Sequence, residues 1–148
     1  MKLNDLIEKG FIDIKDDIQF RTHADVLRLF DFDLKVHQRA GAKHPHDEGV
    51  YIWFPAFYQN DDNDWENTFG VNEDSVFERR KIDNASYLEE LSETPEWHKR
   101  ILFAKIAPFG KVFYKFKGVY HFDPELSQKA KKAVYRRVAT TAKLYPVR

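Results

Sequence analysis

The sequence contains no cysteine, which excludes a disulfide framework, a thiol nucleophile and a metal site built from thiolates. It also lacks an apolar run of about 18 residues, the length that a membrane span needs, and its N-terminus has no apolar stretch of signal-peptide length. A glycine-rich phosphate loop, a GxSxG motif and an HNH-type constellation are missing as well. We therefore expect a cytoplasmic protein without a cofactor, and a binding module in preference to an enzyme.

Acidic residues are scarce in the last third of the chain. Residues 99–148 contain thirteen lysines or arginines but two acidic residues, a net charge of +11, so residues 1–98 carry −11. This polarity suggests a basic surface for a polyanion. Alternatively, the two parts of the chain pair with each other across the fold, and the sequence leaves both interpretations open.

The length of the chain fits one domain, residues 1–148, in which residues 1–20 form an N-terminal arm or helix. Capping residues and glycines predict helices at 3–9, from Thr22, and at 84–91 with Asn84 as its N-cap. Aromatic and β-branched runs predict strands at 50–54, 65–69, 75–81, 100–107 and 111–122. Polar residues predict a long loop at 31–48, and 125–133 is expected to be helical. Residues 134–139 either continue that helix or form a closing strand.

The two clearest strands, 100–107 and 111–122, are separated by a short turn and predict a hairpin. In the second strand the even-numbered residues form the apolar face, which we expect to face the core. Gly118 lies within that strand and indicates a β-bulge or the close approach of another backbone. These elements together indicate an α+β fold: a small, strongly curved mixed β-sheet or small barrel with two to four flanking helices.

Two clusters of polar residues are weak candidates for chemistry. His44 and His46 carry the side chains of metal ligands, but Pro45 separates them in the expected loop and no third-ligand motif follows, so a solvated loop is favoured. Asp74 and Glu78 precede a basic run, as in the acid-x-acid-Lys pattern of metal-dependent nucleases. An edge strand protected by alternating charges explains this second pattern better.

A third set of residues combines rings, cations and an amide. It consists of Trp53, Phe54, Trp65 and Asn67 in the middle of the chain, and of Tyr114, Lys115, Phe116, Lys117 and Tyr120 on the hairpin. Nucleic-acid-binding proteins need rings to stack on bases, cations for phosphates and amides for base edges. The three rings of the hairpin fall on its core face, so packing explains them individually better than binding does. Trp65, between two acidic residues, is expected to be partly exposed.

The order of several short motifs resembles PUA-like (SRA- and ASCH-like) modules, which are attached to bacterial HNH restriction endonucleases and to helicases of restriction or phage-defence systems. The motifs are Tyr51-Ile52-Trp53-Phe54-Pro55, Asp64-Trp65-Glu66-Asn67, Val76-Phe77-Glu78-Arg79-Arg80, Ile101-Leu102-Phe103-Ala104, Tyr114-Lys115-Phe116-Lys117-Gly118-Val119-Tyr120 and Tyr135-Arg136-Arg137-Val138.

This resemblance implies a PUA-like β-barrel core at residues 21–140 that reads nucleic acid, DNA in preference to RNA, and in some cases a modified base. It also implies that Trp53, Trp65 and Asn67 line a pocket while Lys115, Lys117, Arg136 and Arg137 contact phosphates. Any nuclease or helicase effector would then be a separate polypeptide, or the module would act alone. A small metal-dependent nuclease and a protein-interaction module that uses the charge polarity remain as alternatives.

Overall fold

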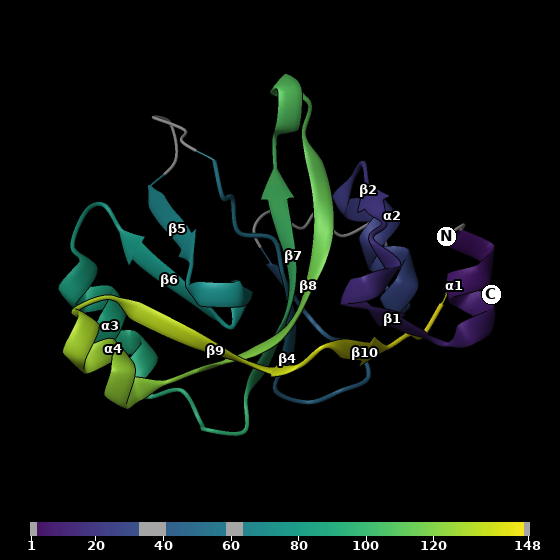
Figure 1. Cartoon of the computed structure of the whole chain (residues 1–148). Helices are drawn as coiled ribbons and strands as arrows, with labels where there is room; N and C mark the ends of the chain where they lie inside the picture. Colours follow the sequence, from purple (N-terminus) through teal and green to yellow (C-terminus); the bar gives the residue numbers. More distant parts are fainter. Residues whose placement is uncertain (1–2, 33–40, 59–63, 147–148) are drawn as a thin grey trace.

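The structure is a computed structural model that describes residues 3–32, 41–58 and 64–146. Its helices are α1 (Leu3–Lys9), α2 (His23–Leu27), α3 (Asn84–Ser92) and α4 (Pro124–Ala130). Its strands are β1 (Phe11–Asp13), β2 (Gln19–Phe20), β3 (Gly41–Lys43), β4 (Val50–Trp53), β5 (Trp65–Phe69), β6 (Ser75–Arg80), β7 (Lys99–Ile106), β8 (Phe113–Phe122), β9 (Ala133–Ala139) and β10 (Thr141–Lys143). The predicted α+β class is confirmed (Figure 1).

Most strands belong to one eight-stranded sheet with the order β3-β4-β7-β8-β9-β6-β5, to which β2 adds by pairing with β8. The β4–β7 pair is parallel and the other pairs are antiparallel, so the predicted mixed sheet is confirmed. Within the part of the chain that the structure describes, β3 and β5 are edge strands that do not pair with each other. The sheet is therefore not closed into the barrel that we considered.

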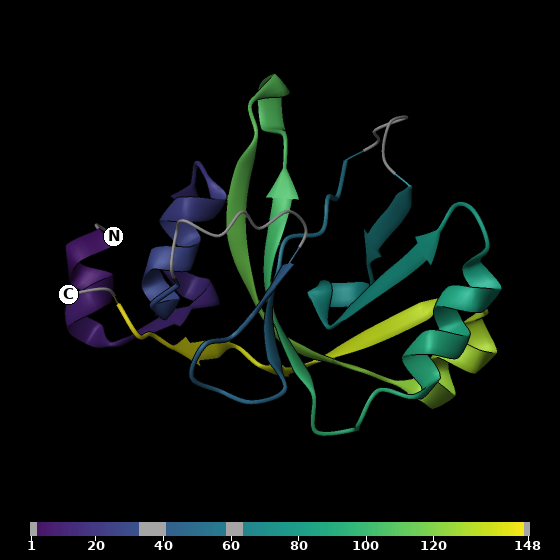
Figure 2. The same ribbon diagram turned by 180° about the vertical axis from the view of Figure 1, so that it is seen from behind.

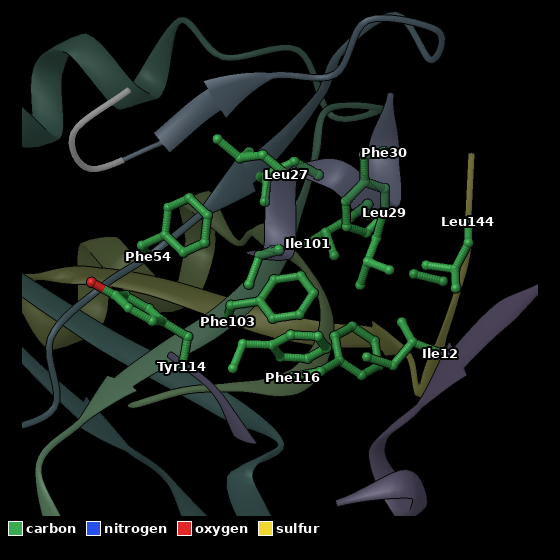
Figure 3. Close-up of a cluster of buried hydrophobic side chains, with 14 of the residues drawn as sticks. Ile12, Leu27, Leu29, Phe30, Phe54, Ile101, Phe103, Tyr114, Phe116 and Leu144 are labelled. Atoms are coloured by element: carbon green, nitrogen blue, oxygen red, sulfur yellow. The ribbon is translucent and has the colours of Figure 1, made fainter. Parts of the chain in front are cut away.

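Strand β7 separates two hydrophobic clusters, because both of its faces are buried. Ile101 and Phe103 belong to the cluster next to α2 and the N-terminal strands, shown in Figure 3. Leu102 and Ala104 point the other way, into a second cluster that includes residues of α3, β6 and β9. A central strand that is covered on both sides can have apolar residues at every position, which explains the run ILFA.

Strand β8 changes the face that its even-numbered residues present. Tyr114 and Phe116 pack in the first cluster, whereas Tyr120 packs in the second and Val119 in the first. The change occurs at a β-bulge, because Leu102 pairs with Gly118 while the next residue of β7, Phe103, pairs with Phe116. The expectation of one uniform core face on this strand is therefore wrong beyond residue 116. The predicted bulge is confirmed, as is the close approach of another backbone, since Ala139 O lies 2.7 Å from where a Cβ of Gly118 would be.

Two local predictions are corrected by the structure, and one choice that the sequence left open is decided. Residues 41–43 within the expected loop form β3, while residues 33–40 lie outside the described part of the chain. The N-cap of α3 is Asp83, whose side chain accepts from Ser86 N, because the Asn84 side chain instead links Arg80 N and Lys131 O. Residues 134–139 are strand, not helix. Lys131 ends α4 in the left-handed conformation, and the Ser127 hydroxyl then accepts from Val134 N at 2.8 Å.

The elements are distributed unevenly around the sheet. Helices α3 and α4 lie side by side at one end of the molecule, and α1 and β10 lie toward the other (Figures 1 and 2). The β7–β8 hairpin extends between these two ends, beyond the neighbouring strands. Among the described residues, no helix has both the length and the apolar character that crossing a membrane requires.

Candidate nucleic-acid interface

A cavity of about 730 Å³ opens on the α3 side of the sheet. Residues of β4, β5, β6, β7, β9 and α3 form its walls, so strands from different parts of the sheet contribute to it. The volume lies within the range of about 300–1,000 Å³ that is usual for small-molecule sites in proteins. The lining combines aromatic rings with several polar side chains, which is the composition of a site that both stacks and orients a ligand.

Two tryptophans of the predicted set line this cavity. Trp53 ends β4 and is 7% exposed, and its ring lies 4.8 Å from that of Tyr135. Trp65 begins β5, is partly exposed as predicted, and contacts the edge of Tyr87 at 4.7 Å between ring centroids. Both rings are thus fixed by neighbouring rings, so a ligand would meet preoriented aromatic walls.

A polar network forms another part of the wall. The Tyr87 hydroxyl donates to Glu78 Oε1 and lies 2.7 Å from the Tyr135 hydroxyl. The Arg100 guanidinium lies 4.7 Å from the centroid of the Trp53 ring and 4.6 Å from that of Tyr135, in cation–π geometry. These groups come from β6, α3, β7 and β9, so four elements must be in place to assemble them.

Burial determines the protonation of this network. It raises the pKa of the Glu78 carboxyl above its usual value, although Arg100 and the Tyr87 hydroxyl act in the opposite direction. Burial likewise raises the pKa of Tyr135 to about 12, so that its hydroxyl remains protonated at neutral pH. Burial thus makes the Glu78 carboxyl easier to protonate, and the protonated form has one O–H donor in addition to its acceptor oxygen.

Asn67 lines the cavity, and its side-chain oxygen has no hydrogen-bond partner within the described residues. Its Oδ1 is buried and makes no hydrogen bond there, a situation that is unfavourable in a protein interior. Asn67 on β5 is directly opposite Glu78 on β6 in the strand register, so their side chains project from the same side of the sheet. A ligand with a donor group would satisfy the amide oxygen.

The structure does not bring the four predicted basic residues to the cavity wall. Each forms an ion pair with an acidic residue: Lys115 with Asp17, Lys117 with Glu73, Arg136 with Asp123, and Arg137 with Asp74. Three of these acids belong to the acidic first part of the chain. The two parts of opposite charge therefore pair at these positions, in line with the second interpretation of the charge asymmetry.

The two weak catalytic candidates are also kept apart. Asp74 precedes β6 and contacts Arg137, whereas Glu78 lies within the strand and is 5% exposed. The chain between them is extended over four residues, so their Cα atoms lie about 13 Å apart. Two carboxylates that share a cation bind it at about 2.0–2.6 Å and so lie within about 5 Å of each other. The described part of the chain contains no group of three or more metal-ligating side chains.

His44 and His46 lie beside the first hydrophobic cluster, away from the cavity. His44 Nδ1 accepts from the backbone N–H groups of His46 and Asp47, both at 3.0 Å, so this nitrogen holds a turn. His46 Nε2 lies 3.0 Å from Asp31 Oδ2, and its ring stacks on Tyr145. The His44 side chain thus acts as the acceptor that satisfies two backbone donors in the loop.

Replacing His44 by alanine should lower the free energy of unfolding by about 1–3 kcal/mol, because two backbone N–H groups lose their acceptor. Burial lowers the pKa of His44 below 6.5, so its stabilising neutral form is fully present above about pH 6.5, and its contribution is lost as the pH falls through the folded-state pKa. Urea unfolding between pH 7.5 and 5 should show this decline in the wild type. The His44→Ala variant should show a weaker decline of stability, and His46→Ala serves as the control. An equal decline in both variants would contradict the assignment.

Sequence reasoning missed four residues of the site or assigned them elsewhere. Tyr87, Arg100 and Tyr135 were not singled out for binding, and Glu78 was considered a carboxylate for a metal. Within its own segment of sequence, each of these residues looks like an ordinary buried ring or an ordinary surface charge. The signal that the sequence offers is that Glu78 and Tyr135 fall within motifs of the PUA-like resemblance.

Comparison with known proteins agrees with the geometry. Residues 5–144 match the family profile described as the SET and RING associated domain. Among solved structures, the chain aligns with "The 5-Hydroxymethylcytosine-Specific Restriction Enzyme AbaSI", with a TM-score of 0.80 and 30% sequence identity. The alignment covers 98% of this chain and 46% of that chain, so the chain spans about half the length of the enzyme. No curated protein sequence matches it.

Proposed function

The chain belongs to the SET and RING associated (SRA) domain family, whose members read modified cytosine in DNA, and we propose that its cavity receives a modified cytosine turned out of a duplex. The observation that carries this proposal is the buried, unpartnered Asn67 Oδ1 in a cavity bordered by Trp53 and Trp65. An extruded base is held by stacking on such rings and by hydrogen bonds to its Watson–Crick edge. The cavity supplies both kinds of contact.

The polar groups fit the edge of cytosine. Its exocyclic N4 amine is a donor, which suits the acceptor Asn67 Oδ1, whereas thymine presents an acceptor at the equivalent position. In its protonated form, the Glu78 carboxyl would donate to the ring nitrogen N3 beside that amine. A 5-hydroxymethyl substituent adds a hydroxyl group, and the protonated hydroxyls of Tyr87 and Tyr135 lie within the same wall.

The predicted phosphate ligands differ in exposure. The Arg136 side chain is 55% exposed, whereas those of Lys115, Lys117 and Arg137 are 25%, 19% and 14% exposed. In this proposal Arg136 keeps the role of a phosphate ligand, because it can exchange Asp123 for a phosphate at small cost. The other three cations mainly balance acidic residues of the fold.

The proposal predicts selective binding of modified DNA. We expect a duplex with one central 5-hydroxymethylcytosine to bind more tightly than duplexes of the same sequence with 5-methylcytosine or cytosine. Fluorescence anisotropy at several salt concentrations measures this, and log K should fall linearly with log salt. Asn67→Ala should reduce the preference among the three bases more than it reduces the binding of unmodified DNA. Equal affinity for all three duplexes, or no binding at low salt, would refute the proposal.

We also infer that the reading of DNA is coupled to an effector that cuts or remodels it, such as a nuclease or helicase. AbaSI is a restriction enzyme, and the alignment leaves more than half of its chain unmatched. Incubating this chain with modified plasmid and Mg²⁺ or Mn²⁺ tests the inference, and we expect the plasmid to stay intact. Cleavage by the chain alone would contradict it.

A further inference from the structure

Arg100 on β7 places a positive charge in the wall of the cavity. Its guanidinium lies 4.7 Å from the centroid of the Trp53 ring and 4.6 Å from that of Tyr135, and the residue is partly exposed. Among the described residues, no carboxylate oxygen lies within 4.0 Å of a guanidinium nitrogen of Arg100. The four basic residues that were predicted to contact phosphates each have such a partner. Arg100 thus gives the cavity a cation that the fold does not pair.

The groups around Arg100 balance its charge only in part. Glu78 attracts the guanidinium electrostatically, but from beyond ion-pair distance. Burial raises the pKa of the Glu78 carboxyl, which reduces the negative charge that it offers to Arg100. The ring faces of Trp53 and Tyr135 attract the cation without carrying a full negative charge. A cation that is partly withdrawn from water without an anionic partner is unfavourable, so this side chain is better explained by an anion that arrives with the ligand.

The guanidinium lies beside the part of the wall that would face the substituent of the base. In the proposed function the hydroxyls of Tyr87 and Tyr135 are available to the 5-substituent of cytosine, and Arg100 packs against the Tyr135 ring. The planar guanidinium presents parallel N–H donors that match the two oxygens of a carboxylate. A hydroxymethyl group offers one oxygen and no charge. The cavity, at about 730 Å³, leaves space for the larger substituent.

We propose that Arg100 forms an anion subsite of the cavity, through which the chain also accepts cytosine that carries a carboxylate at its 5-position. This inference rests on the proposed function and extends it from a neutral modification to an acidic one. In the bound state the two carboxylate oxygens accept from the guanidinium, while Trp65 and Asn67 keep their contacts with the base itself. The ligand then supplies the negative charge that the fold does not provide.

Binding of single strands tests the subsite without the cost of extruding a base. Three labelled strands of one sequence carry 5-carboxylcytosine, 5-hydroxymethylcytosine or cytosine at one position, and fluorescence anisotropy gives their affinities. Wild-type protein should bind the 5-carboxyl strand at least as tightly as the 5-hydroxymethyl strand, and more tightly than the unmodified one. Arg100→Gln should weaken binding of the 5-carboxyl strand by about 10- to 150-fold, the effect of losing a hydrogen bond to a charged group. Its effect on the 5-hydroxymethyl strand should be much smaller.

Two further variants separate a specific contact with the anion from a general effect of charge. Arg100→Lys keeps the charge but lacks the planar fork, so it should retain part of the affinity for the 5-carboxyl strand. Lys105→Gln removes another cation that lines the cavity, near the opposite end of β7, and should weaken binding of all three strands alike. Urea unfolding of each variant shows whether the protein remains folded.

Other results overturn the anion subsite. If Arg100→Gln weakens binding of the three strands equally, the guanidinium contacts a phosphate or supports the rings of the wall. If wild-type protein binds the 5-carboxyl strand no better than the unmodified strand, the cavity rejects the acidic group, and this result does not depend on the folding of any variant. Failure of the proposed function looks different, because wild-type protein would then show no preference for the 5-hydroxymethyl strand over the unmodified one.

Discussion

Replacing Gly118 by alanine is expected to lower the free energy of unfolding by about 3–5 kcal/mol, the largest loss of stability that we predict for a single substitution. Two costs add at this position. Gly118 has φ +119°, a conformation that side chains with a Cβ rarely adopt, and the added Cβ would lie 2.7 Å from Ala139 O on the paired strand β9. The clash is with backbone, so no side-chain rotation can relieve it.

Gly110 provides the matched control. It also has a positive φ of +80°, but no atom lies within 4 Å of the position that its Cβ would take. Gly110→Ala should therefore cost only the conformational strain, about 1–2 kcal/mol. Urea unfolding of both variants compares the two costs directly. If the two substitutions prove equally destabilising, the close approach of β9 at the bulge is not what requires glycine.

The bulge at Gly118 illustrates how far sequence reasoning reached in the fold. Alternation predicted the hairpin, because a strand within a sheet presents alternate residues to opposite faces. A mid-strand glycine marked the irregularity, and the structure has a bulge there. Alternation alone did not reveal that the extra residue transfers Tyr120 to the other cluster, because that depends on the pairing with Leu102 and Phe103.

The strand β9 shows why the end of the chain stayed ambiguous. Residues 133–139 have a short apolar run followed by two arginines, which suits a helix or a strand equally well. The choice is made by tertiary contacts: β9 fills the space between β8 and β6, and Tyr135 becomes completely buried there. Such contacts join residues far apart in sequence and leave no local pattern.

Tertiary contacts also explain which parts of the site could be predicted from the sequence and which could not. Trp53, Trp65 and Asn67 belong to motifs of the PUA-like resemblance, and all three line the cavity. The basic residues belong to such motifs as well and were expected to contact phosphates, but the charge of Lys115 is balanced by Asp17, almost a hundred residues earlier. Composition shows that a chain has cations, but the fold decides which of them meet carboxylates.

Trp65→Ala is expected to weaken the binding of 5-hydroxymethylcytosine DNA by about 5- to 150-fold, corresponding to the 1–3 kcal/mol of one base–aromatic stacking contact. Trp65 offers a partly exposed ring at the cavity, whereas Trp53 is buried beneath Arg100 and has less surface to offer a base. Anisotropy with the modified duplex and the modified single strand measures the loss. Both ligands should be affected alike, because the base enters the cavity in either case.

Two further variants show whether this loss arises from stacking. Trp65→Phe keeps a ring at the position and should retain most of the affinity, while Phe11→Ala removes an exposed ring on β1, at the far end of the molecule from α3, and should change nothing. Trp65 also packs against the edge of Tyr87, so urea unfolding of each variant separates lost binding from lost folding. If Trp65→Phe binds as weakly as Trp65→Ala while remaining folded, the site recognises the indole through some interaction other than stacking. If Phe11→Ala is equally impaired, the base is not held in this cavity.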